Sequence, residues 1–266
     1  MRNLILLGCL LFFFGCNQRI KSKLLQQQTV QLVKPRLTVS NLIIDSSVVV
    51  AAELKMKDVK IYLTSDGSEP NENSKLYKQQ LEITVPGIYK FKAFHPEWKV
   101  SETEIVEFIK KGKSVDTIIW ETKPHEKYQG QGLNTLVNNS KAMVNFMDPE
   151  WMGFDATAKA KIVFEDMTDI KSFDIGYLND PASWIFPPEK ISVLVSYDGA
   201  LFVEKEKRNI ASLKQTIDQR METISIPINE KIRAIKVEVK NIEIIPSWHE
   251  GAGSSAWLFM DEWVFN

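Results

Sequence analysis

The residues best suited to chemistry in this chain are an adjacent acidic pair, Asp261-Glu262, and three histidines, His95, His125 and His249. Two carboxyls can act as acid and base when both converge on one substrate atom. This pair lies in LFMDEWVF, which reads as a final strand, so the two side chains are expected on opposite faces. We therefore expect no catalysis from the pair, and a structural position for Glu262 near the loop that closes the chain.

Other catalytic signatures are weak. No HExxH motif occurs, and no two histidines have the spacing of metal ligands. No GxSxG nucleophile elbow occurs, although the sequence alone leaves a Ser-His-Asp triad open. The glycine-rich run GAGSS at 251–255 does not lie between a strand and a helix, as a phosphate-binding loop does. These patterns disfavour an enzyme.

Two segments have the composition of a sugar-binding surface. A pyranose offers an apolar face to flat rings and hydroxyls to polar groups. The segment 177–188 is stiffened by prolines, and the segment 245–257 is rich in glycine. The alternative for each tryptophan is core packing, which we favour for Trp257 and also for Trp151 and Phe154. The candidate ligand-binding residues are Asn179, Asp180, Trp184, Phe186, Trp248 and His249.

The totals of the chain bound its partners. Its 266 residues are enough for one large domain or two of ordinary size. Lys and Arg number 33 and Asp and Glu number 34, so no basic surplus exists to release counterions from a nucleic acid. We therefore expect no nucleic-acid partner, whereas a neutral sugar fits the charge balance.

The N-terminal residues predict export and a lipid anchor. The apolar stretch from Leu4 to Phe14 is too short to span a bilayer. Its end, Phe13-Phe14-Gly15-Cys16, resembles a bacterial lipobox, although Phe13 stands where leucine is usual. The resemblance implies a signal peptide over 1–15, lipidation of Cys16 and attachment to a membrane through the lipid. The alternative is an ordinary secretory signal with an incidental cysteine.

The polar segment 16–33 reads as a tether. Asn17 is not the aspartate that typically retains bacterial lipoproteins in the inner membrane, and the tether lacks the acidic run that resembles a surface-export signal. We therefore expect an outer-membrane lipoprotein of the cell envelope, with the face of the membrane left open. Cys9 would leave with the signal peptide, so the mature chain would hold no disulfide.

After residue 34 the sequence alternates with the period of a β-strand, so that each run would bury one face and expose the other. The clearest runs lie at 59–63, 89–93, 158–164 and 235–239. Turn pairs punctuate them at Asp66-Gly67, Pro86-Gly87 and Asp198-Gly199. The pattern predicts an all-β chain of two β-sandwich domains. We place their boundary near residue 113, giving domains at 34–112 and 113–266.

The first domain carries a family resemblance. Residues 59–94 resemble the C-terminal module of chitobiases and β-hexosaminidases, whose hallmark is a Tyr-Thr-x-Asp-Gly-x-x-Pro segment followed by Ser-x-x-Tyr. The positions that match, with one shifted residue, are Tyr62, Thr64, Asp66, Gly67, Pro70, Ser74 and Tyr77. The resemblance implies an immunoglobulin-like sandwich without catalytic residues, whose usual role is packing or spacing.

The second domain resembles the discoidin-like (coagulation factor 5/8 type C) sandwich, a galactose-binding-like jelly roll found at the tail of some family 20 hexosaminidases. The segments that carry the likeness lie at 128–139, 151–156, 182–199 and 246–265. Those enzymes hold a (β/α)8 catalytic barrel upstream, for which we see no room here. Both resemblances therefore imply the non-catalytic region of such an enzyme, and we expect a non-enzyme.

The discoidin resemblance also raises a cofactor. Such sugar-binding modules often hold a structural calcium ion with an aspartate in the first loop and a glutamate near the C-terminus. The matching positions are Asn138 and Glu262. An amide in place of a carboxylate removes a negative charge from a site for a hard cation, so calcium affinity should fall. We expect no cofactor, with a structural calcium left open.

Our leading hypothesis is a non-catalytic carbohydrate-binding envelope lipoprotein that recognises amino-sugar or galactose-type glycans. The alternative is a structural or assembly module that packs against a glycoside hydrolase or another envelope protein. A divergent enzyme is a third hypothesis, which would need catalytic residues that the sequence does not display. The partners implied are a glycan, the membrane through the lipid anchor and, in the alternative, a protein.

Overall fold

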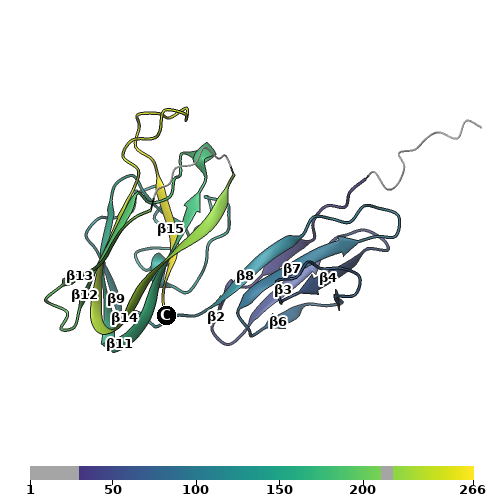
Figure 1. Cartoon of the computed structure of the whole chain (residues 1–266), viewed down its shortest axis with the longest axis horizontal. Coiled ribbons are helices and arrows are strands. Elements are labelled where there is room, and N and C mark those ends of the chain that lie inside the picture. The colour runs from purple at the N-terminus through teal and green to yellow at the C-terminus, as the bar shows by residue number, and fades with distance from the viewer. Residues whose placement is uncertain (1–29, 211–217) are drawn as a thin grey trace, which may run out of the picture.

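The computed structural model describes residues 30–210 and 218–266. The signal peptide, Cys16 and most of the tether lie outside the described residues, and their assignments stay predictions. The described residues form two β-sandwiches joined by a short connection (Figure 1). The prediction of an all-β fold with two sandwich domains is confirmed. Among the described residues, we find no helix with the length and apolarity that crossing a bilayer requires.

The first sandwich packs a three-stranded sheet, β1-β3-β6, on a five-stranded sheet, β2-β8-β7-β4-β5. Its strands are β1 (Arg36–Val39), β2 (Ile43–Ile44), β3 (Val48–Glu53), β4 (Lys60–Thr64), β5 (Lys75–Tyr77), β6 (Leu81–Ile83), β7 (Gly87–Phe94) and β8 (Glu104–Lys110). Alternate residues fill the space between the sheets, as the period of two requires, with Val50 and Phe91 fully buried. Gly67 and Gly87 have positive φ, which suits the predicted turns.

The second sandwich is built around two long strands that bend. Its elements are β9 (Thr117–Trp120), η2 (Thr135–Val137), β10 (Met152–Phe154), β11 (Ala158–Asn179), η3 (Pro181–Ser183), β12 (Lys190–Ser196), β13 (Val203–Asn209), β14 (Arg220–Lys240) and β15 (Leu258–Phe265). The pairing of β11 with β14 shifts register between Val163 and Thr168, next to an exposed stretch of β11. The first half of β11 pairs with β9, and its second half pairs with β15. The two halves of β11 thereby belong to the two opposite layers of the sandwich.

Aromatic side chains fill the space between these layers. Phe164 from the first half of β11 meets Phe265 of β15 edge to face, and Phe173 from the second half stacks on Phe265 at a centroid separation of 4.7 Å. Trp151 and Phe154 are 2% and 1% exposed, so their predicted place in the core is confirmed. This packing makes a rigid body whose loops are held at its two ends.

The two sandwiches meet where β8 ends at Lys110. The backbone N–H of Lys113 donates to the carbonyl of Phe265 at 2.6 Å, so the chain joins the second sandwich directly after the connection. A side chain at Gly112 would lie 2.7 Å from the same carbonyl oxygen, which explains the glycine. The Asn41 amide donates to the carbonyl of Asn139 at 2.8 Å, and the C-terminus lies beside the junction (Figure 1).

One expectation about β15 is wrong. LFMDEWVF does form the final strand, but Asp261 and Glu262 do not act as ordinary alternating neighbours. Trp263 pairs with Ile175 and Met260 pairs with Tyr177, so both acidic residues stand opposite Gly176 alone. This two-against-one arrangement is a β-bulge, which turns consecutive side chains toward one side. Both carboxyls accept hydrogen bonds from the loop 139–142 as a result.

Candidate functional site

The candidate sugar-binding residues lie at one end of the second sandwich, the end that carries the loops between β11 and β12 and between β14 and β15 (Figure 1). We call this end the rim. The first loop turns tightly, because Asp180 and Ile185 exchange backbone hydrogen bonds of 2.9 and 3.1 Å. Trp184 closes the turn in the left-handed conformation, with φ of 62°. A bulky residue rarely adopts this conformation, so the hydrogen bonds of the turn must impose it on Trp184. The turn thereby fixes the position of the Trp184 backbone.

The two rim loops are joined to each other by backbone hydrogen bonds. The N–H of Trp257 donates to the carbonyl of Trp184 at 2.9 Å, and the N–H of Phe186 donates to the carbonyl of Trp257 at 3.0 Å. Consecutive side chains of such a ladder point to opposite faces. Ile185 and Trp257 accordingly join one hydrophobic cluster, while Trp184 and Phe186 join another that contains Trp248.

His249 connects the two loops through its ring. Its Nδ1 accepts the backbone N–H of Gly251 at 3.0 Å, and its Nε2 lies 2.9 Å from the carbonyl of Pro181. Because Nδ1 accepts and a carbonyl cannot donate, Nε2 carries a proton and donates to Pro181. The ring also contacts Trp184, Phe186 and Trp248 at centroid separations of 6.1, 5.3 and 5.6 Å. His249 therefore holds the aromatic rings in their arrangement.

The indole of Trp184 is fixed on one face and along one edge. A Cβ on Gly251 would lie 3.1 Å from three of its ring atoms at once, so the glycine backbone covers a ring face. The indole N–H donates to the Glu250 carboxylate at 3.2 Å. Trp184, Trp248 and His249 are partly exposed, so the rim presents aromatic surface on preordered loops.

Three of the six candidate residues are placed differently from the prediction. Asn179, Asp180 and Phe186 are 6%, 5% and 2% exposed. The Asp180 carboxylate accepts the Gln219 amide at 2.9 Å, and Phe186 packs beneath Trp248 and His249. Burial in a tight turn leaves these side chains little surface for a ligand. They support the loop, and the available candidates at the rim are Trp184, Trp248 and His249.

Sequence reasoning missed a second aromatic group at this end. Tyr128 and His125 contact Trp257 edge to face, with centroid separations of 5.3 and 5.0 Å. All three side chains are partly exposed, and Trp257 packs against the buried cluster of Ile185 and Phe259, as predicted, while part of its surface stays open. The likeness of 128–139 to a discoidin segment was the available signal, but the sequence does not show that the start of the domain folds back beside its end.

Removing the His249 ring tests whether it orders the rim. His249→Ala loses both ring hydrogen bonds and three aromatic contacts, so we expect the free energy of unfolding to fall by roughly 2 kcal/mol. Urea denaturation followed by tryptophan fluorescence measures the change. His95→Ala is the matched control, because that ring lies in the first sandwich, away from the rim, where it accepts an exposed hydrogen bond from the N–H of Glu97 and contacts Trp98. Equal losses in the two variants would show that His249 has no ordering role.

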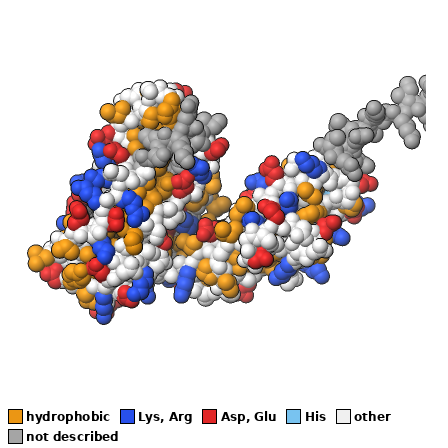
Figure 2. Space-filling model, viewed as in Figure 1, with side chains coloured by type: hydrophobic (Ala, Val, Ile, Leu, Met, Phe, Trp, Pro, Cys, Tyr) orange, Lys and Arg blue, Asp and Glu red, His pale blue; other side chains and the backbone are white. Residues whose placement is uncertain are grey.

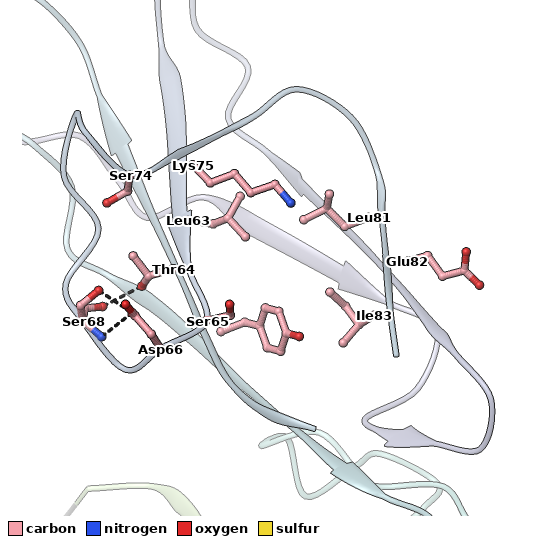
Figure 3. A pocket seen from close by; sticks show the side chains of 11 residues that line it. Leu63, Thr64, Ser65, Asp66, Ser68, Ser74, Lys75, Leu81, Glu82 and Ile83 are labelled. Carbon is pink, nitrogen blue, oxygen red and sulfur yellow. Dashed lines mark hydrogen bonds between the residues drawn. The ribbon is translucent and has the colours of Figure 1, made fainter. Parts of the chain in front are cut away.

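A groove of about 450 Å³ lies in the first sandwich, between the strand pair β4-β5 and strand β6 (Figure 3). Leu63, Ile83 and Tyr89 form its floor, and all three are at most 9% exposed. Asp66 at its edge accepts hydrogen bonds from the side chain and the backbone of Ser68, which lower the pKa of its carboxyl. The groove presents no open aromatic face, so it fits a pyranose less well than the rim does.

The two residues assigned to calcium do not converge. The Asn138 amide donates to Glu150 at 2.7 Å and its oxygen accepts the N–H of Ser140, whereas Glu262 accepts the N–H of Asn139. Within residues 30–210 and 218–266, no group of three or more His, Cys, Asp or Glu side chains could hold a metal ion. The donor set of this structure does not fit calcium at Asn138 and Glu262.

Glu262 is 3% exposed, and its Oε2 has no hydrogen-bond partner among the described residues. Burial raises the pKa of its carboxyl to about 8.

Glu262 also lines a cleft of about 460 Å³ between the two sandwiches, together with Glu107, Lys141 and Asp174. Figure 2 shows acidic and basic side chains interspersed over the face in view, without one dominant sign. The acidic pair thus faces a loop and a domain junction, away from the rim.

Comparison with solved structures finds similar chains at low identity. A SusE-like protein is 11% identical, with 86% of this chain and 96% of that chain covered and a TM-score of 0.36. The C-terminal domain of a chitobiase from Bacteroides fragilis is 11% identical, with 57% and 91% covered and a TM-score of 0.36. The module CBM32-1 from a family 31 glycoside hydrolase of Clostridium perfringens is 13% identical, with 55% and 90% covered and a TM-score of 0.34.

These identities and scores are too low for a shared ligand to follow from them. No curated protein sequence matches this chain. The family comparison is more specific and concerns the first sandwich, where the hallmark residues Tyr62, Thr64 and Asp66 lie. Residues 43–106 match the model of the chitobiase/beta-hexosaminidase C-terminal domain, which confirms the resemblance read from those residues.

Proposed function

We propose that this chain is a non-catalytic carbohydrate-binding lipoprotein of the cell envelope that recognises amino-sugar or galactose-type glycans with the rim of its second sandwich. The supporting observation is the partial exposure of Trp184 and Trp248 on loops that His249 holds in place. Rings that are already ordered lose little freedom on binding, so more of the stacking energy appears as affinity. The Glu250 carboxylate beside Trp184 can accept a sugar hydroxyl.

The rest of the proposal rests on the sequence. Lipidation of Cys16 would tether the sandwiches to the outer membrane through 16–33, with the rim free to reach a glycan. The matched family describes a C-terminal domain of enzymes, and the acidic pair Asp261-Glu262 serves a loop, so the proposed mechanism is equilibrium binding without bond cleavage.

A structural or assembly role is the second candidate, and one observation favours it. The loop between η2 and β10 exposes Met143, Val144 and Met147 by 50%, 42% and 68%. Exposed apolar clusters on folded proteins often mark protein contacts, and methionine suits such surfaces because it is flexible. A glycoside hydrolase or another envelope protein could cover this loop without using the aromatic rim.

A glycan array with the purified protein separates the two candidates. We expect selective binding of galactose or amino-sugar glycans, and about a tenfold weaker affinity for Trp248→Ala because one stacking face is lost. Trp98→Ala is the matched control, since it removes a partly exposed indole from the first sandwich. Absence of binding to every glycan, with co-purification of a hydrolase that Met147→Asp abolishes, would replace the sugar proposal with the assembly role.

A further inference from the structure

The bulge in β15 brings two acidic side chains against one loop. The Glu262 carboxyl accepts the N–H of Asn139 at 3.0 Å, and the Asp261 carboxyl accepts the N–H of Ala142 at 3.3 Å. Asp261 is completely buried and Glu262 nearly so. An ionised carboxyl placed in the interior needs compensating positive charge, because burial removes the water that would solvate it.

The compensating charge comes from the same loop. The ammonium of Lys141 lies 2.7 Å from the Asp261 carboxylate, and the side chains are 12% and 0% exposed. Gly176 leaves the space that this pair fills, since a Cβ there would lie 1.8 Å from Asp261 Oδ1 and 2.4 Å from Lys141 Nζ. The loop, the bulge and the glycine therefore form one arrangement around a buried cation.

This arrangement argues against the structural calcium that the sequence leaves open at Asn138 and Glu262. A calcium ion takes six to eight oxygen ligands, among them carboxylates. Asn138, at the position expected to supply a ligand, instead donates its amide to Glu150. The Asp261 carboxylate is engaged by an ammonium that brings its own positive charge, so a second cation beside it would be repelled.

We infer that the ammonium of Lys141 does in this chain what a structural calcium ion does in the modules that it resembles. It fixes the loop 139–142 to the last strand from within the polypeptide, so the second sandwich folds without calcium and does not take it up. The cation is covalently part of the loop, and chelators in the surroundings leave it in place.

The wild-type protein gives the first test. Its melting temperature is expected to be the same in millimolar CaCl2 and in excess EDTA, measured by circular dichroism. A rise of several degrees in calcium would overturn the inference, because a ligand that binds only the folded state must stabilise it. This arm needs no variant, so it stands whether or not substitutions at Lys141 fold.

The second test removes the ammonium. Lys141→Met leaves Asp261 buried without its partner, and we expect the melting temperature to fall by about 10 °C. Lys159→Met is the matched control, because it breaks a pair with Glu238 that is 39% and 47% exposed, and little change is expected. Adding Asp261→Asn to Lys141→Met should restore part of the loss. Equal melting temperatures for Lys141→Met and the wild type would contradict the role.

The third test asks whether the space left by the side chain accepts a metal ion. Lys141→Ala leaves two carboxyls facing an emptied space that water can enter. We expect calcium to raise the melting temperature of this variant by several degrees, while magnesium, which demands stricter octahedral geometry, has a smaller effect. A Lys141→Ala protein that is indifferent to calcium would overturn the claim that the ammonium stands in a cation's place.

Discussion

Gly176→Ala is expected to lower the free energy of unfolding by about 3 kcal/mol or more, the largest loss for any single added methyl group in the second sandwich. The new Cβ would lie 1.8 Å from Asp261 Oδ1, and the carboxylate cannot move away without leaving Lys141 and the N–H of Ala142. The cost is therefore steric and electrostatic together. Chemical denaturation of the purified protein measures it.

Gly253→Ala is the control for adding a methyl group to glycine. No atom lies within 4 Å of its would-be Cβ, but its φ of +88° disfavours an L side chain, so a loss of only about 1 kcal/mol is expected. If Gly176→Ala lowered the free energy of unfolding no more than Gly253→Ala, the Lys141–Asp261 pair would not be held rigidly against Gly176. The bulge would then not fix the loop 139–142 to β15.

Glu262→Gln is expected to change how stability depends on pH. The folded protein holds a proton on Glu262 up to about pH 8, whereas the ordinary pKa of the side chain is 4.5. Between these values the unfolded chain has released the proton and the folded chain has kept it, so this group's contribution to stability falls as pH rises. Glutamine keeps an oxygen for the N–H of Asn139 and carries no charge at any pH.

The difference in free energy of unfolding between Glu262→Gln and the wild type should therefore grow with pH. We expect the variant to be about as stable as the wild type near pH 4, and more stable near pH 9 by an amount on the order of 4 kcal/mol. Urea titrations at several pH values measure both curves, and groups that do not interact with Glu262 cancel in the difference, whereas the neighbouring Asp261 and Lys141 titrate together with it. A difference that is constant from pH 4 to pH 9 would show that burial leaves the pKa of Glu262 at its ordinary value in the folded state.

The strands and turns were predictable from the sequence because they depend on local patterns. The run at 158–164 falls wholly within β11, and the run at 59–63 falls within β4 except for its first residue. Gly67, Gly87 and Gly199 all have positive φ at the predicted turns. Alternation and turn chemistry act over a few residues, so one sequence displays them. The two-sandwich fold followed from these elements.

The site was predicted only in part, because its geometry depends on long-range pairing. The composition of the rim loops drew attention to Trp184, Trp248 and His249, but not to the tight turn that buries Asn179 and Asp180. The β-bulge arises because two residues of β15 stand opposite one residue of β11. No local sequence pattern reveals this pairing. The Lys141–Asp261 pair joins residues 120 positions apart and was missed for the same reason.

Contact between the aromatic rim and a glycan can be measured from the indole and backbone N–H signals of a ¹⁵N-labelled protein. The protein is titrated with N-acetylgalactosamine, galactose or the glycan that the array selects. We expect the signals of Trp184 and Trp248 to shift in a saturable way, while those of Trp98 and Trp263 stay in place. Shifts confined to residues of the groove in the first sandwich, with Trp184 and Trp248 unchanged, would contradict contact at the rim.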